Sequence, residues 1–479
     1  MIPADGNVIG GAGEVEHTFI HDGTRHSVKV NSSVFAGSLN RGGPLKIRVT
    51  KTGSQTRLAG IRRWLAQATQ YSNRSTYIAT KSASMLVPAA ITIAVLDFGL
   101  WWLISNNLNA SFASALAVLA SVGPVAMALS TSLAMRLGLE NCARKGILVR
   151  NTETMRKLDD VDTVIFNRVG TLATGEPTVE SITAARGEDS ELVLRVAGAL
   201  AMESQHPASR AIVRAAREAR DAGTGGDDIP HWIDVDDLTI TDAGSFVGMV
   251  TIPNKNGELV TVDAELWRPR ELSELRGHLG SVALSGGAPL IVNWDGKTRG
   301  VILLHDTIKE DAEDSIDDLE AMGLETIMIS RDIYPVARRF ADTLGVSKVL
   351  AGIAPGKKDL AVRSVHTAGA NVAMIGDSSV LPCLRVADVG VLFGTGESLN
   401  TKEADVVLFR DDASSIPEML ALARRVSALA DRNIVFAWAY NIAAMVASVA
   451  GVLHPMIATL LMVGSSLVIE GVSSRVRNY

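Results

Sequence analysis

The stretch 164–177, VIFNRVGTLATGEP, begins with β-branched and apolar residues and continues into a turn that contains glycine. Proteins that transfer a phosphoryl group through an acyl-phosphate use an ionised carboxylate as the nucleophile, and a strand-to-loop junction of this kind often holds it. Here the junction carries Asn167, whose neutral amide has no comparable nucleophilic oxygen. The sequence therefore indicates either an enzyme that lacks its nucleophile or a protein of a different kind.

Two other polar residues, Ser330 and Asp377, also follow predicted strands. Between residues 310 and 377, strand-like stretches such as ETIMIS and NVAMIGD alternate with helical stretches such as KKDLAVRSVHTAG. This alternation predicts a parallel, doubly wound α/β sheet. Ligands of such sheets bind at the carboxyl ends of the strands, so we expect Asn167, Ser330 and Asp377 to lie close together.

Two further units flank or interrupt this sheet. Residues 181–298 combine a helix rich in Ala and Arg, PASRAIVRAAREARDAG, with short strands, and are predicted to form a separate inserted lobe. Residues 1–60 are predicted to form a small β-rich unit, because short strands such as that in GPLKIRVTKTG alternate with turns.

Apolar runs predict four membrane helices in two hairpins. About 20 mainly apolar residues span a bilayer, and three runs reach that length while the fourth is shorter. The runs are Met85–Ile104, which contains Asp97, Phe112–Met135, Ile434–Leu453 and Met456–Ile469. Basic residues follow the second and fourth runs, which predicts that both termini and the long central region are cytoplasmic. The first residues, MIPADGNVIGGAGE, have no signal-peptide pattern.

Composition excludes several other classes of protein. The net charge of −6 gives no electrostatic argument for binding nucleic acid. Cys142 and Cys383 lie far apart, so their spacing predicts neither a metal-binding pair nor a disulfide framework, and it suits a reducing cytoplasm.

In this order, the parts resemble a P-type cation-transporting ATPase of the heavy-metal class, degenerate and short at its N-terminus. The resemblance implies a haloacid dehalogenase-like (HAD-like) α/β phosphorylation domain with a parallel sheet, an inserted α+β nucleotide-binding lobe, a partial β-rich actuator domain and four transmembrane helices. The implied boundaries are 1–75 for the partial actuator domain, 82–139 and 430–474 for the transmembrane hairpins, 140–180 with 299–425 for the phosphorylation domain, and 181–298 for the nucleotide-binding lobe.

Short motifs carry this resemblance. FNRVGTLATGEP looks like the family's phosphorylation motif, DKTGTLT; DTIK looks like its hinge motif, PGKK supplies its phosphate-binding lysine, and MIGD begins its magnesium-binding motif. ESQHP resembles the His-Pro signature of the heavy-metal class, in which the histidine helps to hold ATP. The resemblance implies ATP and Mg²⁺ as cofactors. The implied catalytic positions are Asn167, Arg168, Thr171, Asp306, Lys358 and Asp377, the last also for Mg²⁺, and the implied nucleotide-binding positions are Glu203, His206, Pro207, Gly244 and Gly248.

The departures from the family pattern affect the chemistry. Arg168 and Val169 replace the motif's lysine and threonine, SRD at 330–332 replaces TGD, and Asp377 lacks the later Asn-Asp pair. FIHDGTRH at 19–26 replaces the TGES loop that positions the hydrolytic water, and Asp22 is its nearby acid. With a single magnesium carboxylate retained, we expect weakened binding of Mg²⁺ and ATP.

The implied transport path has also changed. Heavy-metal pumps place Cys-Pro-Cys in the membrane helix before the phosphorylation domain because thiolates suit soft metals. The matching stretch here is SVGPVAM, in which Pro124 remains without the cysteines but can still break the helix. WAYN and MVGSS resemble metal-site stretches of the last hairpin, although side chains of these types also pack membrane helices together, and packing is the favoured interpretation. The implied path residues are Pro124, Tyr440, Asn441, Met462 and Ser466, with Ser465 beside them.

Three functions are consistent with these patterns. The favoured one is a P-type ATPase-like membrane protein that cannot form the aspartyl-phosphate and acts as a regulatory or partner subunit, possible partners being adenine nucleotide, the lipid bilayer and another pump chain. The alternatives are an active ATP-driven cation transporter and a membrane-tethered HAD-like phosphatase. The phosphatase also needs an aspartate at position 167, so Asn167 counts against it as well.

Overall fold

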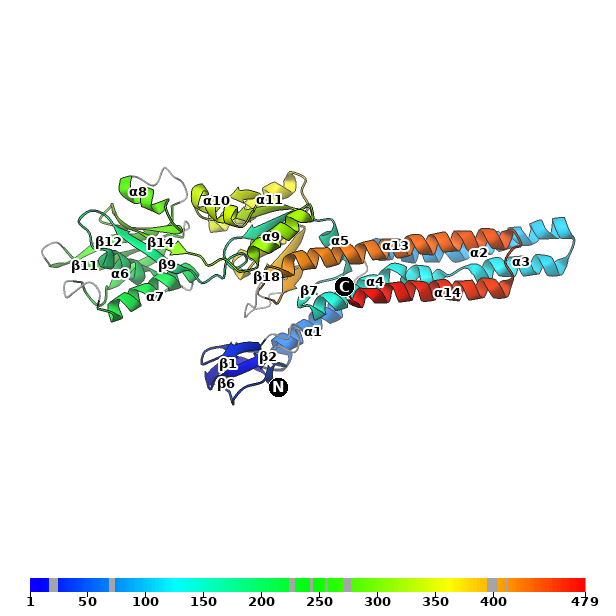
Figure 1. Ribbon diagram of the computed structural model, residues 1–479, viewed down its shortest axis with the longest axis horizontal. Helices are drawn as coiled ribbons and strands as arrows, with labels where there is room; N and C mark the ends of the chain where they lie inside the picture. Colours follow the sequence, from blue (N-terminus) through cyan, green and yellow to red (C-terminus); the bar gives the residue numbers. More distant parts are fainter. Residues whose placement is uncertain are drawn as a thin grey trace.

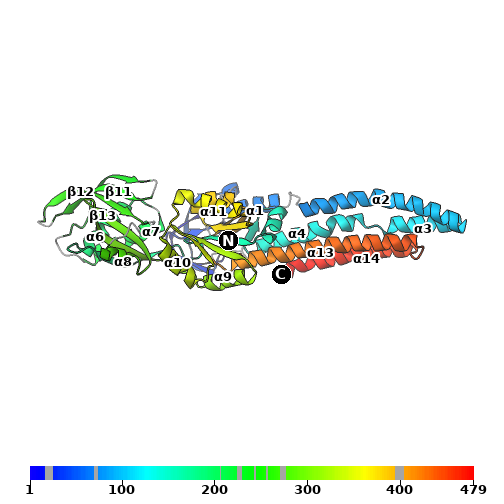
Figure 2. The same ribbon diagram turned by 90° about the horizontal axis from the view of Figure 1, so that it is seen from above.

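The structure, a computed structural model, describes residues 1–479 apart from 17–24, 69–73, 205, 224–228, 242–243, 255–256, 270–276, 394–403, 411 and 479. The molecule is elongated. Along its long axis, a lobe of strands and helices is followed by a central α/β unit and then by a bundle of long helices (Figures 1 and 2). The N-terminal strands lie to one side, next to the junction between the central unit and the bundle (Figure 1).

The central unit is built on a seven-stranded sheet. Its strands are parallel except for the last pair, and the middle strands are buried along their whole length, as expected when helices cover both faces. In spatial order the strands are β16 (Lys348–Leu350), β15 (Glu325–Ile329), β8 (Thr163–Asn167), β17 (Val372–Gly376), β18 (Val389–Phe393), β19 (Val406–Leu408) and β7 (Ile147–Val149). Its helices are α5 (Thr152–Asp159), α9 (Ala312–Ala321), α10 (Tyr334–Thr343), α11 (Lys358–Thr367) and α12 (Leu381–Val386). The parallel sheet predicted from the sequence is confirmed.

The register of this sheet places the predicted strand ends side by side. Ile329 of β15 pairs with Asn167 of β8, and Ile375 of β17 pairs with Phe166. Ser330 and Asp377 therefore leave the sheet at the same edge as Asn167. This is the edge at which ligands of parallel sheets bind.

The inserted lobe has a six-stranded antiparallel sheet. Its strands are, in spatial order, β10 (Val235–Ile240), β11 (Phe246–Pro253), β12 (Leu259–Trp267), β13 (Ala288–Trp294), β14 (Lys297–His305) and β9 (Thr178–Ala184). Its helices are α6 (Ser190–Ala201), α7 (Pro207–Asp221) and α8 (Gly277–Ala283). Strands β9 and β14 pair with each other. The expected border at 181 falls within β9, and the one at 298 falls within β14. The chain thus enters and leaves the lobe through two neighbouring strands.

The N-terminal unit consists of two three-stranded sheets around a small apolar core. Its strands are β1 (Asp5–Gly10), β2 (Gly13–Glu16), β3 (Arg25–Val28), β4 (Ser33–Val34), β5 (Leu39–Asn40) and β6 (Lys46–Lys51). Asp5 is 5% exposed and accepts hydrogen bonds from the backbone N–H groups of Ala36 and Arg57, which ties the strands to the start of helix α1 (Arg57–Ala68). The predicted β-rich character of residues 1–60 agrees with this arrangement. Asp22 lies outside the described residues.

The long helices are α2 (Arg74–Ser105), α3 (Leu108–Ser121), α4 (Pro124–Arg144), α13 (Ser415–Val449) and α14 (Pro455–Ser474). Among the described residues, three spans are long and apolar enough to cross a membrane: Ala79–Ser105, Leu108–Arg144 and Pro455–Ser474. The predicted segment Ile434–Leu453 is not among them. Helix α13 ends at Val449, before the end of that segment, and its N-terminal half is charged and packs against the central unit. The shorter fourth segment does qualify, because α14 extends beyond it at both ends.

Candidate functional site

Asn167 is the centre of a buried hydrogen-bond network at the carboxyl end of β8. Its side chain is 3% exposed as part of a fully buried strand. Lys358 Nζ donates to Asn167 Oδ1 at 2.7 Å, while Asn167 Nδ2 donates to the Val169 carbonyl at 2.8 Å and to Asp377 Oδ1 at 3.4 Å. Asn167 thus joins the predicted lysine to the predicted magnesium aspartate.

The partners of the Asn167 amide fix its orientation. The Lys358 ammonium can only donate, so the amide oxygen of Asn167 must face it. The Val169 carbonyl and the Asp377 carboxylate can only accept, so the amide nitrogen must face them. Mg²⁺ requires oxygen ligands in near-octahedral geometry. The Asn167 amide presents N–H donors, not oxygen ligands, to the Val169 carbonyl and to Asp377 Oδ1, so the residues present do not fit Mg²⁺ between them.

Glycine and threonine of the same turn support the strand end. Thr171 is fully buried, and its hydroxyl donates to the Asn167 carbonyl. Gly170 has a φ of +81°, and a Cβ there would lie 3.0 Å from the Asp377 carboxylate. The turn therefore needs glycine both for its left-handed backbone and for the close approach of Asp377.

Arg168 forms a second network beneath the first. Its guanidinium donates to Asp306 at 2.6 Å and also pairs with Asp332, and all three side chains are at most 8% exposed. The guanidinium also lies 4.6 Å from the centroid of the Phe340 ring, within cation–π range. Burial alone would raise the pKa of Asp332, but Arg168 and Arg268 together hold it below its usual value. Arg168 is thus a structural cation that two carboxylates neutralise.

Lys358 is the first residue of helix α11, and it lies close to Asp377 of the first network and to Asp332 of the second. Burial lowers the pKa of the Lys358 ammonium, and the nearby Asp377 opposes that shift. Burial also raises the pKa of the neighbouring Cys383 thiol to about 11. Cys383 is therefore a neutral thiol at physiological pH and does not supply a thiolate ligand.

A cavity of about 360 Å³ extends from this strand edge to the inserted lobe. Volumes of this order are typical of small-molecule sites. Arg268 of the lobe donates to Asp332 of the central unit at 3.2 Å, and Arg331 reaches back to the Gly244 carbonyl at 3.3 Å. The residues that line the cavity and were predicted for the site are Asn167, Arg168, His206, Pro207, Gly244, Lys358 and Asp377.

The other predicted positions lie elsewhere. Thr171 and Asp306 support the lining residues but do not line the cavity. Glu203 is solvent-exposed in the turn after α6 and does not line the cavity. Gly248 lies within β11, where a Cβ would meet Val235, outside the lining.

His206 caps the start of α7. Its Nδ1 accepts a hydrogen bond from the backbone N–H of Ala208 at 3.2 Å. Partial burial in the cleft, followed by the charges of Arg268, Arg331 and Lys358, lowers the pKa of His206 to about 4. The imidazole is therefore neutral at physiological pH and adds no charge to the cavity.

Sequence reasoning missed the lobe's contribution to the base of the cavity. Trp267 lines the cavity, and its indole Nε1 is buried without a hydrogen-bond partner in the part of the chain that the structure describes. Arg268 follows it directly. Neither residue belongs to a motif, so the only available signal was that a strand of the lobe ends at this point.

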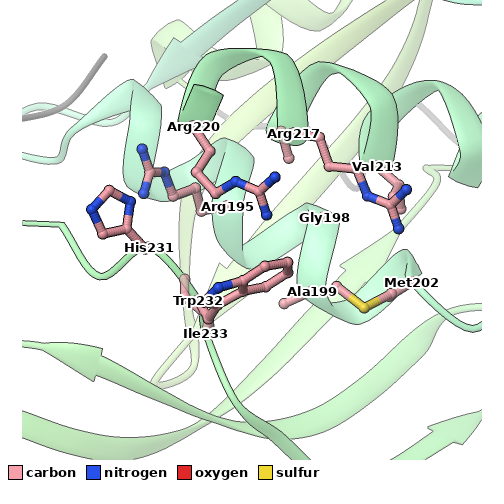
Figure 3. A pocket seen from close by; sticks show the side chains of 11 residues that line it. Arg195, Gly198, Ala199, Met202, Val213, Arg217, Arg220, His231, Trp232 and Ile233 are labelled. Carbon is pink, nitrogen blue, oxygen red and sulfur yellow. The ribbon is translucent and has the colours of Figure 1, made fainter. Parts of the chain in front are cut away.

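A smaller hollow of about 40 Å³ lies between α6, α7 and residues 231–233 (Figure 3). The Arg220 guanidinium is 4.4 Å from the centroid of the Trp232 ring, and Arg195 bonds both Glu191 and the Pro230 carbonyl. No predicted site residue lines this hollow. Its arginines serve the packing of the lobe, and the exposed Arg217 at its edge provides a reference position outside the main cavity.

Four of the predicted transport-path residues lie at the break between α3 and α4: Pro124, Tyr440, Asn441 and Met462. Pro124 is the first residue of α4, and the Gly123 N–H donates to Asn441 Oδ1 at 2.9 Å. The Tyr440 hydroxyl donates to the Ser121 carbonyl at 3.0 Å. Met462 lies close to Gly123, whereas the hydroxyls of Ser465 and Ser466 both donate to the Met462 carbonyl within α14. Side chains of the last hairpin thus satisfy the backbone groups that the break leaves unpaired.

Comparisons with known proteins agree with this architecture. Residues 161–380 match the model of the haloacid dehalogenase-like hydrolases, and residues 1–66 match that of the P-type ATPase actuator domain. A probable copper-exporting P-type ATPase V of Mycobacterium tuberculosis (strain ATCC 25618 / H37Rv) is 31% identical, with 100% of this chain and 61% of the relative aligned. Copper-transporting ATPase 2 of Rhizobium meliloti (strain 1021) is also 31% identical, over 96% of this chain and 55% of the relative.

A solved structure shares the fold. The crystal structure of a zinc-transporting PIB-type ATPase in its E2.Pi state superimposes with a TM-score of 0.61 and 22% identity, covering 99% of this chain and 76% of that one. The chain spans about three fifths of the length of the curated relatives named above. From its actuator and HAD-like regions, its helices able to span a membrane and its similarity to copper pumps along its length, the chain belongs to the P-type ATPase family and is related to its heavy-metal pumps.

Proposed function

We propose that this chain is a P-type ATPase-like membrane protein that binds adenine nucleotide, does not form an aspartyl-phosphate, and acts as a regulatory or partner subunit of another pump chain. The single observation that carries the proposal is the Asn167 network. An amide bonded at both ends to Lys358, Val169 and Asp377 has no carboxylate oxygen with which to attack a phosphorus atom.

The cavity supports nucleotide binding. It lies between the lobe and the strand edge, and it combines basic side chains with apolar ones that include Phe246, Leu266 and Leu290. Because the Asn167 amide occupies the position between Val169 and Asp377, we propose that the binding of Mg²⁺ is weakened.

The same proposal excludes metal transport by the chain alone. The named relatives are copper pumps. Here Pro124 has Gly123 and Val125 beside it, and the hydrogen bonds of Tyr440 and Asn441 close the helix break. A soft cation would find no thiolate among these residues.

We further propose that both termini and the large central region are cytoplasmic. Arg136, Arg144 and Lys145 lie toward the end of α4, and Arg475 and Arg477 follow α14. An excess of basic residues marks the cytoplasmic side of membrane helices.

A phosphorylation assay tests the proposal. The full chain, purified in detergent and incubated with ATP labelled at the γ-phosphate, should incorporate no acid-stable label. Asn167→Asp should not by itself restore rapid turnover, because SRD at 330–332 and the short magnesium motif remain changed. A phosphoenzyme of the wild-type chain that hydroxylamine cleaves would show that it is an active pump instead.

A further inference from the structure

The Asn167 amide nitrogen lies between two oxygen acceptors. It is 2.8 Å from the Val169 carbonyl and 3.4 Å from Asp377 Oδ1. With an aspartate at position 167, a second carboxylate would face Asp377 at this distance, and two like charges so close require a proton or a cation between them. The neutral amide removes this repulsion and supplies the N–H donors itself.

Basic side chains outnumber carboxylates in the lining of the cavity, whereas a site built around a metal ion needs anionic or neutral oxygen ligands. Its lining contains four basic side chains, Arg168, Arg268, Arg331 and Lys358, and two carboxylates, Asp332 and Asp377. His206 is neutral, and the buried Asp306 pairs with Arg168, so four positive charges face three negative ones and one positive charge remains in excess without any added cation. Guanidinium groups bind phosphate oxygens through paired N–H donors, so this excess fits a polyphosphate.

Apolar side chains from one face of the lobe's sheet also line the cavity. Phe246 and Leu266 are paired residues of β11 and β12, and together with Leu290 they pack in the same apolar cluster as α6 and α7. These side chains give the cavity an apolar surface against which a planar ring can pack.

We propose that this cavity binds a free nucleoside polyphosphate without a divalent cation, with the Asn167 amide in the place of the ion and Arg268, Arg331 and Lys358 facing the phosphates. This inference rests on the nucleotide binding proposed above and specifies its ligand. It makes the occupancy of the site independent of the Mg²⁺ concentration.

Tryptophan fluorescence of the full chain in nanodiscs tests the inference, with ATP titrated in excess EDTA and again in Mg²⁺. We expect the two dissociation constants to agree within about threefold. In Asn167→Asp, EDTA should weaken binding by at least about tenfold, which corresponds to about 1.4 kcal/mol. Circular dichroism and thermal unfolding of each variant verify that it is folded.

Arginine variants separate the cavity from the rest of the lobe. Arg331→Ala should weaken ATP binding by about tenfold or more in both conditions, because it removes charge-assisted hydrogen bonds. Arg217→Ala, on the exposed face of α7, should leave it unchanged. Wild-type binding that is lost in EDTA and restored by Mg²⁺ overturns the inference but leaves the proposed nucleotide binding intact. The absence of binding in both conditions overturns both.

Discussion

At the scale of single residues, Arg168 holds the strand edge together electrostatically. It is 4% exposed and neutralises Asp306 and Asp332, which are themselves buried. Replacing it with an apolar residue leaves the buried Asp306 without this cation and Asp332 with Arg268 as its remaining paired arginine, and the loss of a buried ion-pair partner costs about 3–5 kcal/mol. Arg168→Met should therefore lower the free energy of unfolding by this order, measured by pulse proteolysis in urea.

The control for this prediction is Arg217→Met. Arg217 is exposed on α7, and substitutions at such positions change stability by less than about 0.5 kcal/mol. Equal effects of the two substitutions would mean that the buried ion pairs of Arg168 do not stabilise the chain.

The sequence predicted some of these residues and not others, for physical reasons. Asn167, Lys358 and Asp377 could be grouped because parallel strands end at one edge of a sheet. Arg268 could not, because its position depends on how the lobe faces the central unit, which no local pattern encodes. Glu203 shows the converse: a motif fixes its spacing from His206 but not the direction in which its side chain points.

At the scale of elements, the break between α3 and α4 depends on side chains of the last hairpin. The sequence predicted that Pro124 could break the helix, but not which groups would satisfy the freed backbone. Asn441 does so: it is 1% exposed, accepts from the Gly123 N–H at 2.9 Å and donates to the Ala437 carbonyl at 2.7 Å. Its amide therefore joins α13 to the start of α4.

Replacing this amide should destabilise the bundle. Asn441→Leu leaves the Gly123 N–H unpaired in an apolar setting, which we expect to cost about 1–2 kcal/mol. Unfolding in mixed micelles of increasing SDS content measures the change. Ser466→Ala is the matched control, since the Ser466 hydroxyl bonds only a carbonyl of its own helix among the described residues. A loss as large in the control would assign the effect to side-chain volume instead.

At the scale of the whole molecule, the distance between the cavity and the bundle determines how nucleotide binding can affect the membrane helices. The lobe, which helps to line the cavity, and the bundle, which contains the helix break, lie on opposite sides of the central unit along the long axis (Figures 1 and 2). Helix α13 is continuous from the core of the central unit into the bundle. Helix α4 also runs from the bundle into the same core. A nucleotide that changes the position of the lobe can therefore affect the bundle through the central unit and the two helices α4 and α13.

The orientation of the chain in the membrane is testable with single cysteines. The native Cys142 and Cys383 are 0% and 2% exposed, so their reaction with a bulky maleimide gives a low background. Asn109→Cys lies at the start of α3, beside the turn of the first hairpin, and Glu313→Cys lies on the exposed face of α9. If basic residues mark the cytoplasmic side, a membrane-impermeant maleimide should label Asn109→Cys in intact cells and Glu313→Cys only after permeabilisation. Labelling of Glu313→Cys in intact cells would place the central unit and its cavity outside the cytoplasm, away from cellular ATP, and the proposed nucleotide-binding role would then be wrong.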